Sequence, residues 1–442
     1  MSRGRTRAPE GGTLVAGMPL FLEESRALPL VDLELVFRTG SALDPEGKEG
    51  VTRLLGRMCR MGTKKLRGHE VEERVSALGG RLSIDVSTSY LRVHGTVIRR
   101  NLEPFVELVA SLVSTPALRV ADLAHVKREA EADRIASFDN DRGLVARHFR
   151  KALFRDHPYG RSVVGTKKSL RGIDRSDLVE FHQANFVRGN LLVGAAGDID
   201  LETFAPMVER YLADLPDGTA RAARVPATKQ RRGMHLLVVD KPQRSQTQIL
   251  VGTLGSRFRD PLTFPLLVAN TAFGGMFTGR LMHEIRTVRG LSYGASSRIG
   301  QDHARDAFSM YTFPTASETA STVELMLSLY RQFVVDGISD AEAEAAKQYL
   351  ANSRCFEEDT AHKRLDALLD AALFGLPSDH YTRFAEHVRA VEPEVARSAI
   401  RERLSTRDLQ IVVVATASEV QSSLSQLGGL TSIEVVPYDA DV

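Results

Sequence analysis

The sequence has little cysteine, no marked excess of either charge and no long apolar run. Cys59 and Cys355 are its two cysteines. They lie far apart and outside any C-x-x-C spacing, which argues against a disulfide framework or a cysteine-ligated zinc site. The formal net charge is +2, with both signs interspersed, so no basic surface points to nucleic acid or to an anionic membrane.

Signals for export or membrane insertion are also missing. A conventional transmembrane helix needs about eighteen consecutive apolar residues, and the sequence has no such run. Its first twenty residues have a charged start followed by Pro, Glu and Gly instead of a continuous apolar stretch, so we expect no signal peptide. The composition, 43% hydrophobic and 26% charged over 442 residues, is ordinary for a soluble globular protein. We expect a cytoplasmic protein.

Metal-binding histidine motifs are absent as well. The twelve histidines form neither H-E-x-x-H nor H-x-x-E-H, and the His283-Glu284 pair lacks a second histidine at ligand spacing. No nucleophile elbow or Cys-His constellation supports a self-sufficient hydrolase that uses other residues. The sequence therefore predicts no catalytic metal bound by this chain.

One pattern occurs twice. VDLELVFRTGSALDP ends in Asp44-Pro45, and SQTQILVGTLGSRFRDP ends in Asp260-Pro261. In both halves an apolar-periodic helix, a strand-like run, a long amphipathic helix and a terminal apolar strand follow in the same order. The alternative is that this order arises by chance in an α/β protein, which the paired Gly-Ser and Asp-Pro markers disfavour.

The repeat predicts an α+β fold of two similar domains. We expect an N-terminal extension with a first strand in residues 1–24 and a first domain in 25–215. A linker rich in Arg, Ala, Pro and Gly follows in 216–233. The second domain spans 234–442, and each domain is near the upper end of typical domain size.

The segment GVTRLLGRMCRMGT in the first half has the spacing of a metal-binding helix but not its residues. Arg53 and Arg57 are one turn apart on one face, beside Gly56. Two histidines at such positions can reach one zinc ion, and a glutamate between them can take a proton from its water. The apolar stripe at helical spacing is Val51, Leu54, Leu55 and Met58.

The longer segment EGVTRLLGRMCRMGT resembles the zinc helix of the insulinase, pitrilysin and mitochondrial processing peptidase family, the inverzincin metallopeptidases. The resemblance covers both halves and implies two homologous α/β-layered domains that form half of a clamshell. It places the two zinc histidines at Arg53 and Arg57, the general-base glutamate at Gly56 and the third ligand at Asp133. Arg53, Arg57 and Gly56 can neither bind zinc nor act as a general base, and Asp133 alone keeps a carboxylate. The resemblance therefore implies a degenerate zinc site.

Two interpretations of the arginine pair remain open. Either Arg53 or Arg57 forms an ion pair with Asp133, so that a protein cation takes the place of the metal. Alternatively, both guanidiniums are solvated on a charged helix face without a carboxylate partner.

The second half retains candidate catalytic residues in NTAFGGMFTGRLMHEIRTVRGLSYGASS. On residue chemistry alone, Arg286 is a cation near a helix end and Tyr293 a strand residue, with Gly290 ending the helix before a strand that begins near Leu291. The segment resembles the family's C-domain motif, in which this Arg and Tyr face the zinc from the other half of the clamshell. The resemblance implies that both donate to the scissile carbonyl, where negative charge develops.

A weaker part of the resemblance concerns substrate binding. Gly79-Gly80 precedes a predicted strand, which in relatives is the edge that holds the substrate backbone by strand addition. The positions concerned are Gly80, Leu82 and Ser83, although the family usually has Asn near Ser83.

These features favour the non-metal subunit of a heterodimeric zinc metallopeptidase, and we expect it to contribute to proteolysis only together with a zinc-bearing partner. A homologous, zinc-bearing subunit would be its partner, zinc would be the partner's cofactor, and Arg286 and Tyr293 would act in trans on a peptide substrate. A catalytically inactive scaffold or peptide-binding protein of the same fold is the alternative. Pairing of two identical chains is also open.

Overall fold

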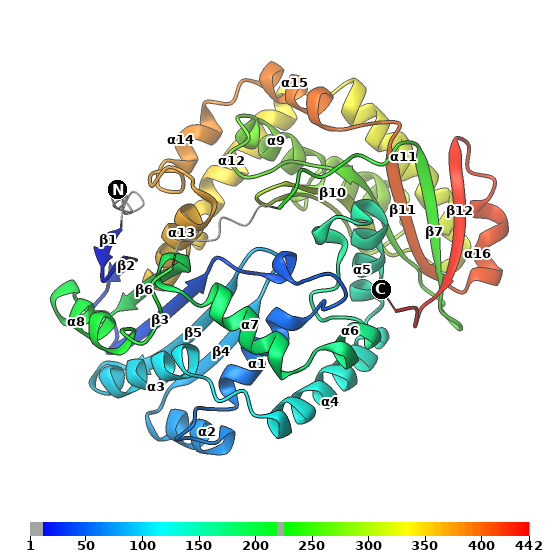
Figure 1. The fold of residues 1–442 in the computed structure, drawn as a ribbon. Coiled ribbons are helices and arrows are strands. Elements are labelled where there is room, and N and C mark those ends of the chain that lie inside the picture. Colours follow the sequence, from blue (N-terminus) through cyan, green and yellow to red (C-terminus); the bar gives the residue numbers. More distant parts are fainter. Residues whose placement is uncertain (1–11, 219–224, 442) are drawn as a thin grey trace, which may run out of the picture. The chain divides into compact units, whose positions relative to one another are not determined.

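Two compact units make up the part of the chain that a computed structural model describes, residues 12–218 and 225–441. Unit 1 takes its described residues from Met1–Asp133, Ser162–Val225 and Cys355–Tyr381. Unit 2 takes them from Arg134–Arg161, Pro226–Arg354 and Thr382–Val442. Figure 1 shows the helices and strands of both units.

The described residues of unit 1 contain a six-stranded sheet with the order β1-β2-β6-β3-β5-β4. Strands β2 and β6 are parallel, and the remaining pairs are antiparallel. The strands are β1 (Thr13–Val15), β2 (Met18–Glu24), β3 (Leu30–Phe37), β4 (Arg81–Val86), β5 (Leu91–Ile98) and β6 (Leu191–Gly197).

The described residues of unit 2 contain a second six-stranded sheet, with the order β12-β7-β11-β8-β10-β9. Strands β7 and β11 are parallel, and β11-β8, β8-β10 and β10-β9 are antiparallel. The strands are β7 (Met234–Asp240), β8 (Gln248–Leu254), β9 (Ala295–Gln301), β10 (Arg305–Thr312), β11 (Leu409–Ala415) and β12 (Leu430–Pro437).

The two sheets share one topology across five strands, which confirms the internal repeat. From β2 to the edge strand β4, and likewise from β7 to the edge strand β9, the first pair of neighbouring strands is parallel and the next three pairs are antiparallel. The sixth strands differ, because β1 is antiparallel to its neighbour and β12 is parallel to it. The fold is thus a mixed α/β fold with two similar sheets.

Helices cover both sheets. Those of unit 1 are α1 (Val51–Arg60), α2 (Gly68–Ala77), α3 (Leu102–Ser114), most of α4 (Val120–Ala136), α6 (Lys167–Gly172), α7 (Arg175–Asn185), α8 (Leu201–Tyr211) and α13 (Ala361–Phe374). Those of unit 2 are α5 (Asp141–Phe154), α9 (Thr263–Asn270), α10 (Arg280–Met282), α11 (Thr319–Val335), α12 (Asp340–Ser353), α14 (Phe384–Arg389), α15 (Pro393–Arg403) and α16 (Ala417–Leu424).

In each unit, one helix that covers the sheet comes from the other half of the sequence. Helix α13 contacts β6 and β2 of unit 1, whereas α5 contacts β11 and β8 of unit 2. A glycine permits each close approach. A Cβ at Gly194 would lie 3.0 Å from side-chain atoms of Leu365 and Leu369, and one at Gly252 would lie 2.8 Å from Phe149.

The compact units therefore differ from the contiguous domains expected in 25–215 and 234–442. The segments 134–161 and 355–381 belong by their contacts to the opposite unit. Within the expected extension, the described residues already form β1 and β2. Residues 1–11 of that extension and 219–224 of the expected linker lie outside the described residues.

The Asp-Pro turns hold the starts of the helices that follow them. Asp44 accepts hydrogen bonds from the backbone N–H groups of Gly50 (2.6 Å) and Thr52 (3.1 Å) at the start of α1. Asp260 accepts one from Leu262 N–H (3.0 Å) just before α9. A carboxylate at a helix N-terminus satisfies donors that have no partner within the helix.

One predicted boundary is wrong. Gly290 does end the preceding helical segment, with a φ of +64°, but the next strand begins at Ala295 and not near Leu291. The residues between them form a turn, and Tyr293 lies in this turn rather than in a strand. The Ser292 hydroxyl holds the turn by accepting a hydrogen bond from Phe313 N–H (3.3 Å).

Truncation of Leu369 on α13 should destabilise unit 1. Leu369 is fully buried against β6, so Leu369→Ala leaves a cavity and should cost about 2–5 kcal/mol. The measurement is the free energy of unfolding from denaturant titration. Leu28→Ala, at a residue that is 62% exposed, is the control and should change it little. Equal effects of the two substitutions would show that α13 does not stabilise the sheet.

Candidate functional site

Helix α1 packs on the sheet through the apolar stripe predicted from the sequence. Its predicted apolar stripe is buried, and Gly56 lies against the sheet. A Cβ at Gly56 would be 3.1 Å from Cγ2 of Ile84 and 3.5 Å from Cδ1 of Leu91. The absence of a side chain at this position thus lets α1 pack closely on β4 and β5, and a glutamate there would have to displace these neighbours.

The structure brings two of the four degenerate-site residues into direct contact. The Arg57 guanidinium donates a hydrogen bond to the Asp133 carboxylate on α4. The Arg57 side chain is 25% exposed and that of Asp133 is 59% exposed. Of the two arginines that could pair with Asp133, Arg57 is the one that forms the ion pair.

Arg53 lies close to the same charges. Partial burial lowers the pKa of Arg53, and the neighbouring Arg57 adds to this effect, whereas Asp133 and Asp85 act against it. Arg57 therefore disfavours the charge on Arg53, and the two carboxylates compensate for this in part.

These residues do not fit a zinc ion. Guanidinium groups carry only donors and no lone pair for a metal, Gly56 offers no side chain, and Asp133 already accepts from Arg57. Two positive charges at the ligand positions would also repel a cation. Among the described residues, three other side chains have ligand atoms that all lie within 4.8 Å of one another: Glu34, His94 and His362.

In unit 2 the structure brings Arg286 and Tyr293 together. The Arg286 guanidinium carbon lies 4.6 Å from the centroid of the Tyr293 ring. It also lies 5.0 Å from the ring centroid of Phe277, a residue that the sequence did not single out. Both rings are largely exposed, Tyr293 by 78% and Phe277 by 67%. The guanidinium thus makes cation–π contacts with two aromatic rings.

Unusual helical turns present this cluster. Arg286 lies in the π-helical turn η7 (His283–Val288), and Phe277 follows a second π-helical turn, η6 (Thr271–Gly275). π-helical segments are rare and are frequent at functional sites. The sequence shows only the apolar spacing of a helix here, so neither turn could be predicted from it.

Close packing and hydrogen bonds hold η6 against β9. A Cβ at Gly274 would lie 2.7 Å from Oγ of Ser297, which leaves room for glycine alone. The Ser297 hydroxyl donates to Oδ1 of Asn270 (2.9 Å), and this residue pair is buried. The small residues of this segment therefore serve packing.

The candidate substrate-binding residues lie on an edge strand. Strand β4 is the last strand of its sheet and pairs with β5 alone. Gly80 precedes it and packs on Phe105, Leu82 is buried, and the Ser83 hydroxyl donates to Asp85 (3.2 Å). An edge strand has unpaired backbone groups that another extended chain can bind.

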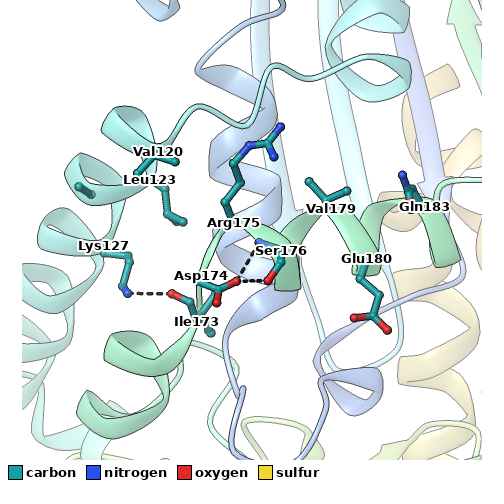
Figure 2. A pocket seen from close by; sticks show the side chains of 11 residues that line it. Val120, Leu123, Lys127, Ile173, Asp174, Arg175, Ser176, Val179, Glu180 and Gln183 are labelled. Atoms are coloured by element: carbon teal, nitrogen blue, oxygen red, sulfur yellow. Dashed lines mark hydrogen bonds between the residues drawn. The ribbon is translucent and has the colours of Figure 1, made fainter.

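A separate groove of about 940 Å³ lies on unit 1 between α4 and α7. Figure 2 shows Val120 and Leu123 on one wall and Val179 on the other. At its base, Asp174 caps α7 by accepting from Ser176 N–H (2.8 Å). The sequence-predicted site residues are not among the residues that line this groove.

Comparison with known proteins identifies the family. The model of the insulinase family, peptidase family M16, matches residues 21–167, and the model of the M16 inactive domain matches residues 172–350. The chain belongs to the M16 peptidase family. It is a member without the H-x-x-E-H zinc motif and with the C-domain arginine and tyrosine.

Several M16 relatives resemble the chain over most of its length. A protein of Mycobacterium leprae named as an uncharacterized zinc protease is 27% identical over 76% of this chain and 76% of its own. The non-peptidase homolog YmxG of Helicobacter pylori is 22% identical over 90% of this chain and 92% of its own. The relatives thus include proteins named as proteases and one named as a non-peptidase.

Solved structures show the same fold. A structure described as the peptidase M16 inactive domain from Pseudomonas fluorescens has a TM-score of 0.84 at 24% identity, covering 92% of this chain and 96% of that one. A structure described as a protease from Helicobacter pylori has a TM-score of 0.82 at 16% identity, covering 92% and 100%. At these identities the likeness concerns the fold alone.

Within residues 12–218 and 225–441, no helix combines the length and the apolar character that a membrane crossing demands.

A double-mutant cycle should detect the ion pair in the degenerate site. Because Asp133 is largely exposed, Arg57→Ala and Asp133→Ala should show a coupling energy of roughly 0.2–1 kcal/mol. The measurement is the free energy of unfolding of the two single variants and the double variant. Arg60 provides the control, because it lies on the same helix as Arg57 but pairs with Glu72 on α2 (2.6 Å). The effects of Arg60→Ala and Asp133→Ala should therefore be additive. Equal coupling in both cycles would contradict a specific Arg57–Asp133 pair.

Proposed function

We propose that this chain is the non-metal subunit of a heterodimeric, cytoplasmic zinc metallopeptidase. It supplies Arg286 and Tyr293 to a peptide held in a chamber shared with a homologous subunit that carries the zinc. The observation that carries the proposal is the contrast between the units: Arg57 is ion-paired with Asp133 where a metal ligand would be, whereas Arg286 remains clustered with an exposed tyrosine.

The geometry of unit 2 suits recognition of a carbonyl oxygen. A guanidinium and a phenol are both hydrogen-bond donors, and donors aimed at a developing negative charge are among the strongest contributors to catalysis. Cation–π contacts with Tyr293 and Phe277 favour the observed position of the guanidinium. Since Tyr293 is 78% exposed, its hydroxyl is accessible to a substrate.

The lack of metal ligands on α1 explains why a partner is needed. Arg53, Gly56 and Arg57 offer no metal ligand, so this chain cannot supply the family's zinc at that helix. A pair of identical chains would have the same deficiency twice, and the proposed partner is therefore a different M16 chain. The edge strand β4 supports peptide binding as a further contribution of this subunit.

Substitution of the two donors should reduce turnover by the complex. Loss of one donor to a developing oxyanion typically lowers kcat by about 10²–10³-fold, so Arg286→Ala and Tyr293→Phe should each have an effect of that order. The complex would be purified through a tag on this chain, its partner identified by mass spectrometry, and cleavage of a peptide library measured. Arg331→Ala and Tyr349→Phe, at exposed positions on α11 and α12, are the matched controls.

Other outcomes would support the scaffold or overturn the proposal. Unchanged turnover with Arg286→Ala and Tyr293→Phe would favour a noncatalytic scaffold or peptide-binding protein of the same fold. Chelator-sensitive cleavage by this chain alone, without a homologous chain, would contradict the requirement for a zinc-bearing partner.

A further inference from the structure

A second cluster of ionisable side chains lies in unit 1, on the face of the sheet opposite to α1. Strand side chains alternate between the two faces. Leu33 and Leu35 pack in the core beneath α1, whereas Glu34 points to the face that α13 covers. His94 on β5 and His362 on α13 point to the same place.

The three side chains converge on one buried carboxylate. Glu34 is 1% exposed as a side chain, His94 29% and His362 33%. Nδ1 of His94 lies 2.6 Å from Oε1 of Glu34, and Nδ1 of His362 lies 3.8 Å from the same oxygen. Within the described residues, Oε2 of Glu34 and Nδ1 of His362 are buried and have no hydrogen-bond partner. Buried polar atoms without partners are costly and call for a ligand.

The Nε2 atoms of both histidines, which point away from Glu34, already have polar partners. Nε2 of His362 lies 3.5 Å from Oδ2 of Asp366. Nε2 of His94 lies 3.4 Å from the Thr96 hydroxyl, which donates to Asp32 (2.6 Å). Metal-binding histidines commonly donate their second N–H group to a carboxylate or another acceptor, which orients the ring and fixes its tautomer. Here that leaves both Nδ1 atoms directed at Glu34.

The charges around the cluster favour a dication. Arg92 is the nearby guanidinium, and it pairs with Asp366 (2.6 Å) and Asp370 (3.1 Å). Its Nε lies 3.9 Å from Oε2 of Glu34, beyond hydrogen-bond distance. With neutral imidazoles, the carboxylates of Glu34, Asp366 and Asp370 exceed the single Arg92 guanidinium by two negative charges, and Asp32 adds a further one beside Thr96. A divalent ion would offset much of this excess.

We propose that Glu34, His94 and His362 form a structural site for one divalent transition-metal ion of the zinc type. Two imidazoles and a carboxylate are ligands that Zn²⁺ accepts, with water completing the coordination. The ion takes the place of the proton that lies between His94 and Glu34, and metal–ligand distances of about 2.0–2.2 Å require small side-chain shifts. It cross-links α13 to β3 and β5, which belong to distant parts of the sequence.

This site is independent of the proposed peptidase role. It lies on the sheet face opposite to α1 and has no part in the cluster of Arg286 and Tyr293. A peptidase subunit without this metal, or a metal-binding scaffold without peptidase function, would each be consistent with one proposal and contradict the other.

The test uses the full chain, stripped with chelator and freed of any histidine tag. Co²⁺ is titrated and its visible absorption recorded, followed by competition with Zn²⁺. We expect one equivalent of each ion to bind and Zn²⁺ to raise the melting temperature by several degrees. Glu34→Gln and His362→Ala should each weaken binding by at least about 100-fold, a loss larger than the 10–100-fold typical of outer partners.

The control is His125→Ala, which removes an imidazole that lies 3.2 Å from Glu129 on the surface of α4 and should leave the titration unchanged. Because His362 is one-third exposed, His362→Ala should retain the fold, to be verified by circular dichroism. The proposal is overturned if the wild-type chain binds less than one equivalent, or if both ligand variants bind Co²⁺ as tightly as wild type. Arg286→Ala should bind the metal normally, which separates this result from the fate of the peptidase proposal.

Discussion

The central strands of both sheets are buried on both faces, and the rest of the structure depends on this constraint. Every residue of β11 and all but the last of β6 are buried. A sheet of this kind needs a layer of helices on each side. In both units, part of the second layer is a helix from the opposite half of the sequence, α13 on β6 and α5 on β11. The two halves therefore cannot bury their sheets fully with their own residues.

Packing also explains why α1 can remain a helix of the core although it lacks the zinc-binding residues. Its apolar stripe belongs to the core of unit 1 and stabilises the sheet whether or not a metal is present. Gly56 even lets the helix approach the sheet more closely than a larger residue would. Arg57 is not part of this core, and its ion pair with Asp133 occupies the place where the resemblance put zinc ligands. The residues that stabilise the fold are therefore largely different from those that the resemblance assigns to chemistry.

Patterns that are local in sequence were predicted well. The stripe of α1, the Asp-Pro helix starts and the order of strands and helices in the two halves all follow from spacing within short segments, and the structure confirms them. The π-helical turns around Arg286 could not be predicted, because they share their apolar spacing with ordinary helices. The turn that carries Tyr293 was mistaken for a strand, since Gly290 marks the end of a helix but not the start of the next element.

The sequence by itself determined the family, the repeated architecture and the loss of the zinc motif, because each is written in residue types at short spacing. Only the tertiary structure decided that Arg57 pairs with Asp133, that Phe277 lies against Arg286, and that α5 and α13 cover sheets of the opposite halves. It also brought Glu34, His94 and His362 together. Such contacts join residues far apart in the chain, and their partners are selected by the burial of whole faces rather than by any local pattern.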